Sequence, residues 1–174
     1  MNRQSKLADS LEALHALQRQ GAVAIRSRHL SRTHRERLVE NGFLREVIKG
    51  WYVASRPDET AGDSTPWYAS FWDFCAAYLN ERFGNEWCLS PEQSLLLHAG
   101  NRAVPAQLLV RAPKGGNKPT ALPHGTSLFD VRATMPDEGE IVVRTACGSI
   151  HLRPGSWRFP RTSSGATRPT RARR

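Results

Sequence analysis

The sequence predicts an α+β fold, and three observations carry the prediction. Apolar residues recur at helical spacing up to Gly100, whereas short apolar runs typical of strands follow it. Helix start and stop signals, together with turn residues, divide the chain into short elements. The net charge of +9 is distributed unevenly over 174 residues, a length that allows a small module beside a second compact domain.

A helix is expected first, over residues 5–20. Its leucines recur at steps of four, three and three, which makes one apolar stripe of Leu7, Leu11, Leu14 and Leu17. Gly21 is typical of the position just after a helix end. Residues 22–25 then indicate a short strand, and residues 26–30 indicate one or two turns of a second helix.

A capping box predicts the start of the next helix. In Thr33-His34-Arg35-Glu36, the Thr33 hydroxyl would accept a hydrogen bond from the Glu36 amide, and the Glu36 carboxylate would accept one from the Thr33 amide. The helix is expected to end at Asn41-Gly42. Its inward face would hold Leu38, Val39 and Phe43, which leaves outside Arg32, Arg35 and Glu36.

A hairpin is expected over residues 44–53, which are rich in Val, Ile, Trp and Tyr, with its turn at Lys49-Gly50. Long helix, short strand, short helix, capped helix and hairpin then follow one another in the order of a winged helix-turn-helix. We call residues 1–55 the head. This order predicts that the head binds duplex DNA with one helix in the major groove.

A linker is expected over residues 56–66, a polar segment with a proline near each end. We call residues 67–152 the body and expect a small α+β domain there. Its helices are predicted over residues 67–83 and from a capping box at Ser90-Pro91-Glu92-Gln93 to Gly100. Its strands are predicted over residues 107–111, 127–132, 140–144 and 149–152. Residues 153–174 are rich in Arg and Pro and are expected to be disordered.

Charge favours the head as a nucleic-acid-binding region. The net charge is +6 over residues 1–56, −4 over residues 57–152 and +7 over residues 153–174. A basic region implies a polyanionic partner, although solubility is the plainer interpretation of any basic cluster. In the head the charge lies on a predicted DNA-reading motif, so we interpret it as functional. For residues 153–174 a nonspecific nucleic-acid arm and a passive tail are both open.

The predicted DNA contacts lie on three parts of the head. The start of the capped helix supplies Arg32, Thr33, His34 and Arg35, the preceding element Arg26 and Arg28, and the hairpin Arg45, Lys49 and Trp51. Arg32 and Arg35 are expected to read bases, and Lys49 to contact phosphate. Two alternatives stay open: Trp51 packs within the hairpin, and the winged helix binds a protein in place of DNA.

Catalysis, a cofactor and a metal site are not expected. Cys75, Cys88 and Cys147 do not fall at zinc spacing, and an odd number of widely spaced cysteines indicates a reduced, cytoplasmic setting. The longest apolar runs are too short to span a membrane. Residues 114–118 lack the spacing of a phosphate-binding loop and are expected to form a basic hairpin loop.

The head and part of the body resemble AbiEi-type antitoxins and related winged-helix regulators. The resemblance rests in the head on Leu38, Val39, Gly42, Leu44, Val47, Gly50 and Tyr52. It continues in CLSPEQSLLLHAG with Ser94, Leu95, His98 and Gly100. The resemblance implies a transcriptional regulator of a toxin–antitoxin system with a DNA-binding head. It also implies a toxin partner, of the nucleotidyltransferase or Fic type.

The head and body, including LPHGTSLFDVRA, are also similar to the N-terminal region of long bacterial Fic family proteins, associated with cell filamentation. Those proteins continue into a domain that transfers AMP, whose HPFxxGNGR-like loop has no counterpart in this sequence. The alternative function is therefore a regulatory or protein-interaction fragment without a catalytic domain. Because the resemblance ends after about Glu140, we expect a chain truncated or frameshifted at its C-terminus.

Overall fold

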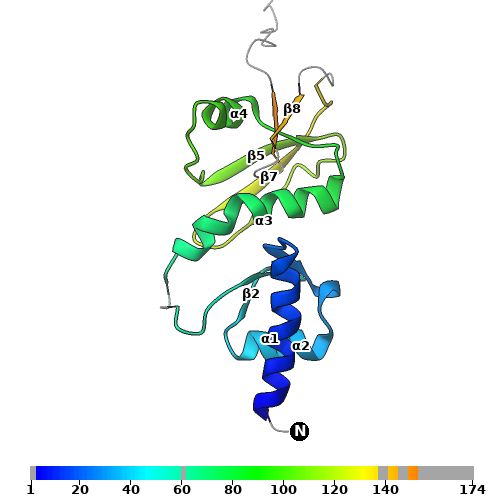
Figure 1. Cartoon of the computed structure of the whole chain (residues 1–174). Coiled ribbons are helices and arrows are strands. Elements are labelled where there is room, and N and C mark those ends of the chain that lie inside the picture. Colours follow the sequence, from blue (N-terminus) through cyan, green and yellow to red (C-terminus); the bar gives the residue numbers. More distant parts are fainter. Residues whose placement is uncertain (1–2, 60–61, 137–140, 145–148, 153–174) are drawn as a thin grey trace, which may run out of the picture.

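The computed structural model describes residues 3–59, 62–136, 141–144 and 149–152 (Figure 1). Helices and sheets occur together, so the fold is α+β, as the sequence predicts. In the head the elements are α1 (Arg3–Arg19), β1 (Ala24–Arg26), the 3-10 helix η1 (Ser27–His29), α2 (Arg32–Glu40), β2 (Leu44–Ile48) and β3 (Trp51–Ala54). After it come α3 (Thr65–Phe83), β4 (Cys88–Leu89), α4 (Pro91–His98), β5 (Gln107–Ala112), β6 (Pro119–Ala121), β7 (Ser127–Arg132), β8 (Ile141–Arg144) and β9 (Ser149–Leu152).

The head has a small apolar core between its helices and its sheet. The buried cluster contains one side chain each from α1, β1, α2 and β2 and one from the residue after η1, namely Leu14, Ile25, Leu38, Leu44 and Leu30. The sheet is antiparallel with the strand order β1-β3-β2, so β1 joins the hairpin at its second strand. Gly50 turns the hairpin with a φ of 78°, a conformation that glycine adopts without strain. The expected helix, strand and hairpin positions are therefore found.

The start of α2 differs from the expected capping box. The N-cap is Ser31, whose Oγ accepts a hydrogen bond from the His34 amide at 3.2 Å. Thr33 lies inside the helix, and the Glu36 carboxylate pairs with Arg32 at 2.6 Å. The prediction of Thr33 as the cap is wrong because Ser31, two residues earlier, already satisfies a free amide of the first turn.

Val39 is also placed differently from its prediction. Its side chain is 42 % exposed, whereas that of the preceding Leu38 is fully buried. Successive residues of an α-helix point about 100° apart, so a short helix that directs Leu38 into the core turns Val39 away from it. The inward face of α2 therefore consists of Leu38, and Phe43 just beyond the helix is partly buried against the same cluster.

A second, larger core joins the sheet of the head to α3. The indole of Trp51 is in edge-to-face contact with Phe74 and Tyr78, at centroid distances of 6.0 and 5.5 Å. Val53 and Trp67 belong to the same buried cluster. The apolar core is thus continuous from β3 to α3. The division of the chain into domains, with a linker at residues 56–66, stays a prediction.

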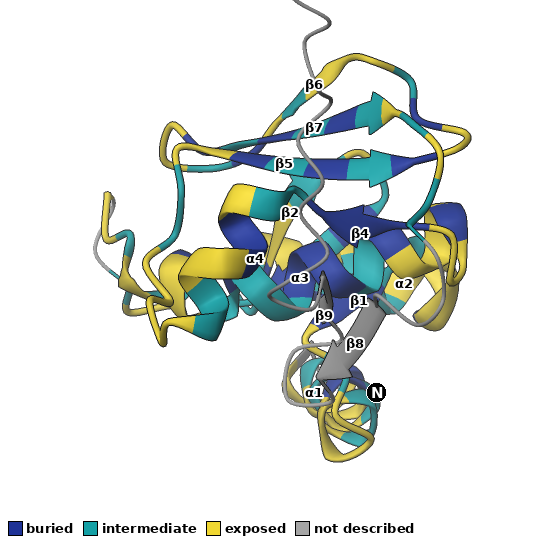
Figure 2. Ribbon diagram, turned by 90° about the horizontal axis from the view of Figure 1, so that it is seen from above, coloured by how far each residue is buried: buried dark blue, intermediate teal, exposed yellow. Residues whose placement is uncertain are grey.

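The larger sheet has the strand order β4-β5-β7-β6, with β5 and β7 parallel. Alternate side chains of β5 and β7 are buried, and Figure 2 shows α3 and α4 on one side of these strands. β7 lies between β5 and β6, so residues 113–118 cross the end of β7 and do not form the expected hairpin loop. That expectation is wrong because strand order depends on distant pairing, which the loop sequence does not encode.

Three further predictions concern the cap of α4, membrane-spanning helices and the C-terminal segment. Ser90 caps α4 by accepting from the Gln93 amide, with Pro91 in the first turn, as the sequence predicts. Among the described residues, no helix is both long and apolar enough to cross a membrane. The expected disordered segment, residues 153–174, lies outside the described residues.

Candidate nucleic-acid interface

The first two turns of α2 expose polar side chains. Arg32, Thr33 and Glu36 are exposed, and the Arg32 Nε lies 2.6 Å from the Glu36 Oε1. This hydrogen bond lowers the pKa of the Glu36 carboxyl and raises that of the Arg32 guanidinium. Both groups therefore stay charged at neutral pH, one as a donor and the other as an acceptor.

The other arginines of α2 turn back onto neighbouring elements. Arg35 donates to the Ser27 carbonyl at 3.0 Å, and its guanidinium carbon lies 5.9 Å from the Tyr52 ring centre. Arg37 donates at 2.8 Å to the Lys6 carbonyl and at the same distance to the Ser10 Oγ. The expectation that Arg35 lies on the outward face is therefore wrong. Its long side chain finds a backbone acceptor on η1, a partner that local sequence does not indicate.

His34 is half-buried between α2 and α1. Its Nδ1 lies 2.9 Å from the Ser10 Oγ, and its backbone amide donates to the Ser31 cap. Ser10 itself is fully buried and donates to the Lys6 carbonyl. These contacts hold α2 against α1, so His34 has a structural role between the two helices.

The hairpin turn meets η1 and α2 at one residue. The Ser27 amide donates to the Gly50 carbonyl at 2.9 Å, and the Ser27 carbonyl accepts from Arg35. Glu46 stabilises the turn by accepting from the Gly50 amide at 2.9 Å. The exposed Lys49 of the turn and the exposed Arg28 of η1 are thus brought close to the start of α2. Arg28, Arg32 and Lys49 form the candidate interface.

Arg26 and Arg28 share one carboxylate of α3. The Glu81 Oε1 lies 2.7 Å from the Arg26 Nε, and the Glu81 Oε2 lies 3.0 Å from a terminal nitrogen of Arg28. The Arg26 guanidinium also lies 4.8 Å from the centre of the Trp51 ring. Arg26 therefore acts in the junction between head and α3, whereas Arg28 keeps 65 % of its side chain exposed. Sequence reasoning missed Glu81 because no local pattern connects it with the head.

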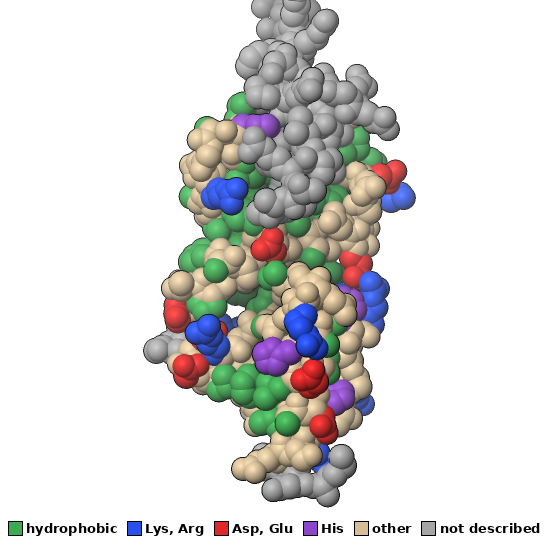
Figure 3. All heavy atoms as spheres, in the orientation of Figure 1, with side chains coloured by type: hydrophobic (Ala, Val, Ile, Leu, Met, Phe, Trp, Pro, Cys, Tyr) green, Lys and Arg blue, Asp and Glu red, His purple; other side chains and the backbone are tan. Residues whose placement is uncertain are grey.

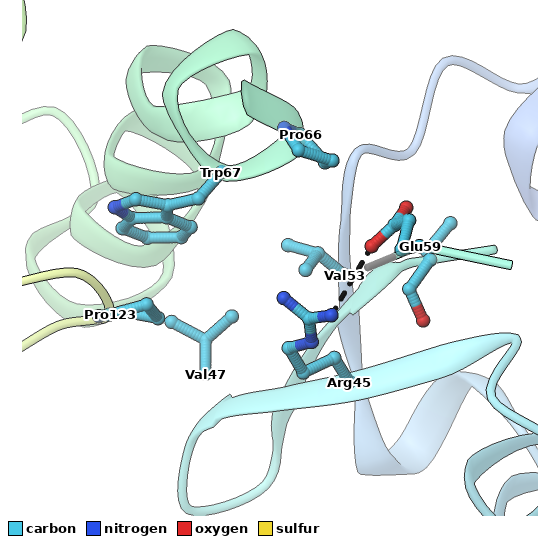
Figure 4. Close-up of a pocket in the computed structure, with 9 residues that line it drawn as sticks. Arg45, Val47, Val53, Glu59, Pro66, Trp67 and Pro123 are labelled. Atoms are coloured by element: carbon cyan, nitrogen blue, oxygen red, sulfur yellow. Dashed lines mark hydrogen bonds and ion pairs between the residues drawn. The ribbon is translucent and has the colours of Figure 1, made fainter. Parts of the chain in front are cut away.

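Trp51 and Arg45 lie apart from the candidate interface. Trp51 is 5 % exposed, so its ring does not reach the surface in this structure, and we leave it out of the interface. Arg45 pairs with Glu59 at 3.2 Å beside a small hollow that both side chains help to line. Figure 4 shows this pair next to the apolar side chains of Val53, Pro66 and Trp67, which come from both sides of the junction.

Charges on the head are mixed. On the face that Figure 3 shows, basic and acidic side chains alternate over the head and do not gather into one basic patch. Among the described residues, five arginines of the head form ion pairs with four carboxylates, those of Glu12, Glu36, Glu59 and Glu81. The excess of positive charge that the sequence indicates is therefore partly neutralised by partners in the fold.

Chemistry of other kinds has few candidates in the described part of the chain. No group of three His, Cys, Asp or Glu side chains that could hold a metal ion occurs among the described residues. Cys75 and Cys88 are buried free thiols, and burial raises the pKa of both, which leaves them protonated and weakly nucleophilic. The expectations of no catalysis and no cofactor stay predictions.

No family model, curated protein or solved structure matches this chain. The resemblances to AbiEi-type antitoxins and to Fic family proteins thus stay expectations from the sequence.

Proposed function

We propose that the head is a winged helix that binds duplex DNA, with α2 in the major groove, and that the protein acts as a transcriptional regulator. The observation that carries the proposal is the meeting of three elements at Ser27. Ser27 donates to Gly50 and accepts from Arg35. These hydrogen bonds hold η1, with the exposed Arg28, and the hairpin turn, with the exposed Lys49, beside the exposed start of α2. A helix that enters the groove needs such flanking cations for the phosphates.

The topology supports the same proposal. Helix, strand, helical turn, helix and hairpin occur in this order, and β1 pairs with the second strand of the hairpin. In a winged helix this arrangement directs the last helix and the hairpin turn toward the same side of the duplex. A toxin partner rests on the resemblance alone and stays a prediction.

Salt dependence of binding tests the proposal. If Arg28 and Lys49 each neutralise one phosphate while Arg32 contacts a base, the logarithm of affinity falls with the logarithm of salt concentration at a slope of about −2. We expect Lys49→Ala to weaken binding equally on a duplex from the gene's own promoter and on a random duplex, and to reduce the slope by about 1. Fluorescence anisotropy at several potassium chloride concentrations measures both effects.

Lys118→Ala is the matched control, because Lys118 is exposed on the loop between β5 and β6, outside the head. Its slope and affinity should equal those of the unmodified protein. A slope near zero for the unmodified protein would overturn the proposal and favour a protein partner. Equal effects of Lys49→Ala and Lys118→Ala would show that binding is not through the hairpin turn.

A further inference from the structure

The outward face of α2 carries one arginine and two carboxylates. Because Arg35 and Arg37 are tied to Ser27 and to α1, the exposed side chains of the helix are Arg32, Thr33, Glu36, Val39 and Glu40. A single arginine thus faces outward together with two carboxylates. A face of this kind is poorly suited to contact phosphates along its length, since the carboxylates repel them.

Arg32 and Glu36 are complementary in hydrogen bonding. The guanidinium can only donate, and the carboxylate, whose pKa is lowered by the bond from Arg32, can only accept at neutral pH. The two side chains satisfy each other on the exposed surface, where water competes for the same bonds. Exchange of this partner for another polar group therefore costs little free energy.

Base edges in the major groove offer the matching groups. Guanine presents two acceptors, O6 and N7, which suit an arginine, and cytosine presents the N4 amino group, which suits a carboxylate. Thymine presents an acceptor and a methyl group there, and guanine presents acceptors only. An ionised carboxylate at these bases would be repelled, so it selects by exclusion as well as by bonding.

We propose that Glu36 is a specificity-determining residue that accepts a hydrogen bond from the N4 amino group of a cytosine, while Arg32 donates to a nearby guanine. This inference rests on the proposed DNA-binding function and deepens it. Residues four apart on a helix are neighbours, with about 5–6 Å between their β-carbons. Successive base pairs rise about 3.4 Å, so the two side chains reach pairs one or two steps apart.

Selection from a pool of randomised duplexes tests the inference. We expect the unmodified protein to enrich cytosine at one position and guanine close to it. Glu36→Gln should shift the preference at the cytosine position to adenine, because an amide can pair with adenine N6 and N7, and should change the cytosine-to-adenine affinity ratio by roughly tenfold or more. Arg32→Ala should remove the preference for guanine and leave the cytosine position unchanged.

Glu40→Gln is the control for charge. Glu40 is the exposed last residue of the same helix, and in the described part of the chain it forms no ion pair. Its substitution removes the same charge, so a general rise in affinity should be equal for the two variants, and the base preference should stay that of the unmodified protein. Far-ultraviolet circular dichroism checks that each variant is folded.

The possible outcomes are distinct. An unchanged cytosine preference in Glu36→Gln, with binding retained, would overturn the inference and leave the proposed function standing. The same shift in Glu40→Gln would also overturn it, since charge alone would then explain the effect. Absence of binding of the folded, unmodified protein to every duplex would overturn the proposed function and this inference with it.

Discussion

Two arginine–carboxylate pairs of this protein have similar lengths but opposite surroundings. Arg32 and Glu36 on α2 lie 2.6 Å apart with 82 % and 52 % of their side chains exposed. Arg82 of α3 and Asp130 of β7 lie 3.0 Å apart with exposures of 34 % and 1 %. The difference shows that distance alone does not indicate what an ion pair does. The exposed pair can exchange partners, whereas the buried pair cannot.

Asp130 organises the end of the larger sheet. Besides Arg82, its carboxylate accepts from the Gly116 amide, and its carbonyl accepts from the Asn117 amide at 2.9 Å. A β-carbon at Gly115 would lie 2.7 Å from backbone atoms of Val131 and Arg132, so only glycine allows this close approach. Asp130 and Gly115 together hold the loop that crosses the end of β7.

The pairs of Glu81 with Arg26 and Arg28 are intermediate. Glu81 keeps 23 % of its side chain exposed and joins α3 to the head next to the core contact of Trp51. Its role is therefore to hold the head against α3, and its contribution to stability should lie between those of the other two pairs. Substitutions in the three pairs test this order.

The largest expected effect is that of Asp130→Asn. Loss of the charge leaves Arg82 without its buried partner, and removal of one member of a buried pair costs several kcal/mol. Because Arg82 is partly exposed to solvent, which compensates part of the loss, we expect the free energy of unfolding to decrease by about 3 kcal/mol. Urea denaturation followed by tryptophan fluorescence measures it.

Asp58→Asn is the control for Asp130→Asn, because Asp58 is exposed in the segment between head and α3. It should leave the free energy of unfolding almost unchanged. Equal effects of the two substitutions would contradict the structural role of Asp130 and remove the contrast between buried and exposed pairs.

A smaller effect is expected for Glu81→Gln. The amide keeps one acceptor oxygen for the two arginines but loses the charge, so we expect the free energy of unfolding to fall by about 1 kcal/mol. Glu86→Gln is the comparison, since Glu86 is exposed and only 3.5 Å from the exposed Lys114. Urea denaturation measures both variants. Equal midpoints would show that Glu81 does not hold the head to α3.

The smallest effect on stability is expected for Glu36→Gln. Both members of its pair are exposed to water, which replaces the lost bond, so the midpoint of urea denaturation should stay within experimental error. The same substitution should nevertheless change the base preference of the head. A lower midpoint for Glu36→Gln would mean that the exposed pair stabilises α2, which would contradict the expected difference between this pair and the buried pair of Asp130.

Signals between neighbouring residues allowed much of the fold to be predicted. The leucine stripe of α1 ends near Gly21, which has a φ of 80°, and Ser90 caps α4, both as expected. The errors occurred where two local signals competed or where a partner lay far along the chain. Ser31 and Thr33 are both good cap residues, and in the fold Ser31 caps α2 by accepting from the His34 amide.

The candidate site was predicted less well than the fold. Arg32, Arg28 and Lys49 are exposed as expected, whereas Trp51 is buried and Arg35 is tied to Ser27. In the amino-acid composition every arginine contributes one positive charge, wherever it lies in the fold. Whether its guanidinium is free to contact a partner depends on the surrounding groups, and these come from other elements.

The sequence by itself determined the α+β class, the positions of most helices and strands, and the basic charge of the head, because these depend on neighbouring residues. Only the tertiary structure decided which arginines pair with carboxylates far along the chain. Glu81 lies 53 positions from Arg28, and Asp130 lies 48 positions from Arg82, yet each forms a hydrogen-bonded pair. Contacts at such separations follow from packing of the whole chain. Bringing distant residues together costs conformational entropy, and burial of the shared core offsets this cost, whereas local helix and strand preferences do not.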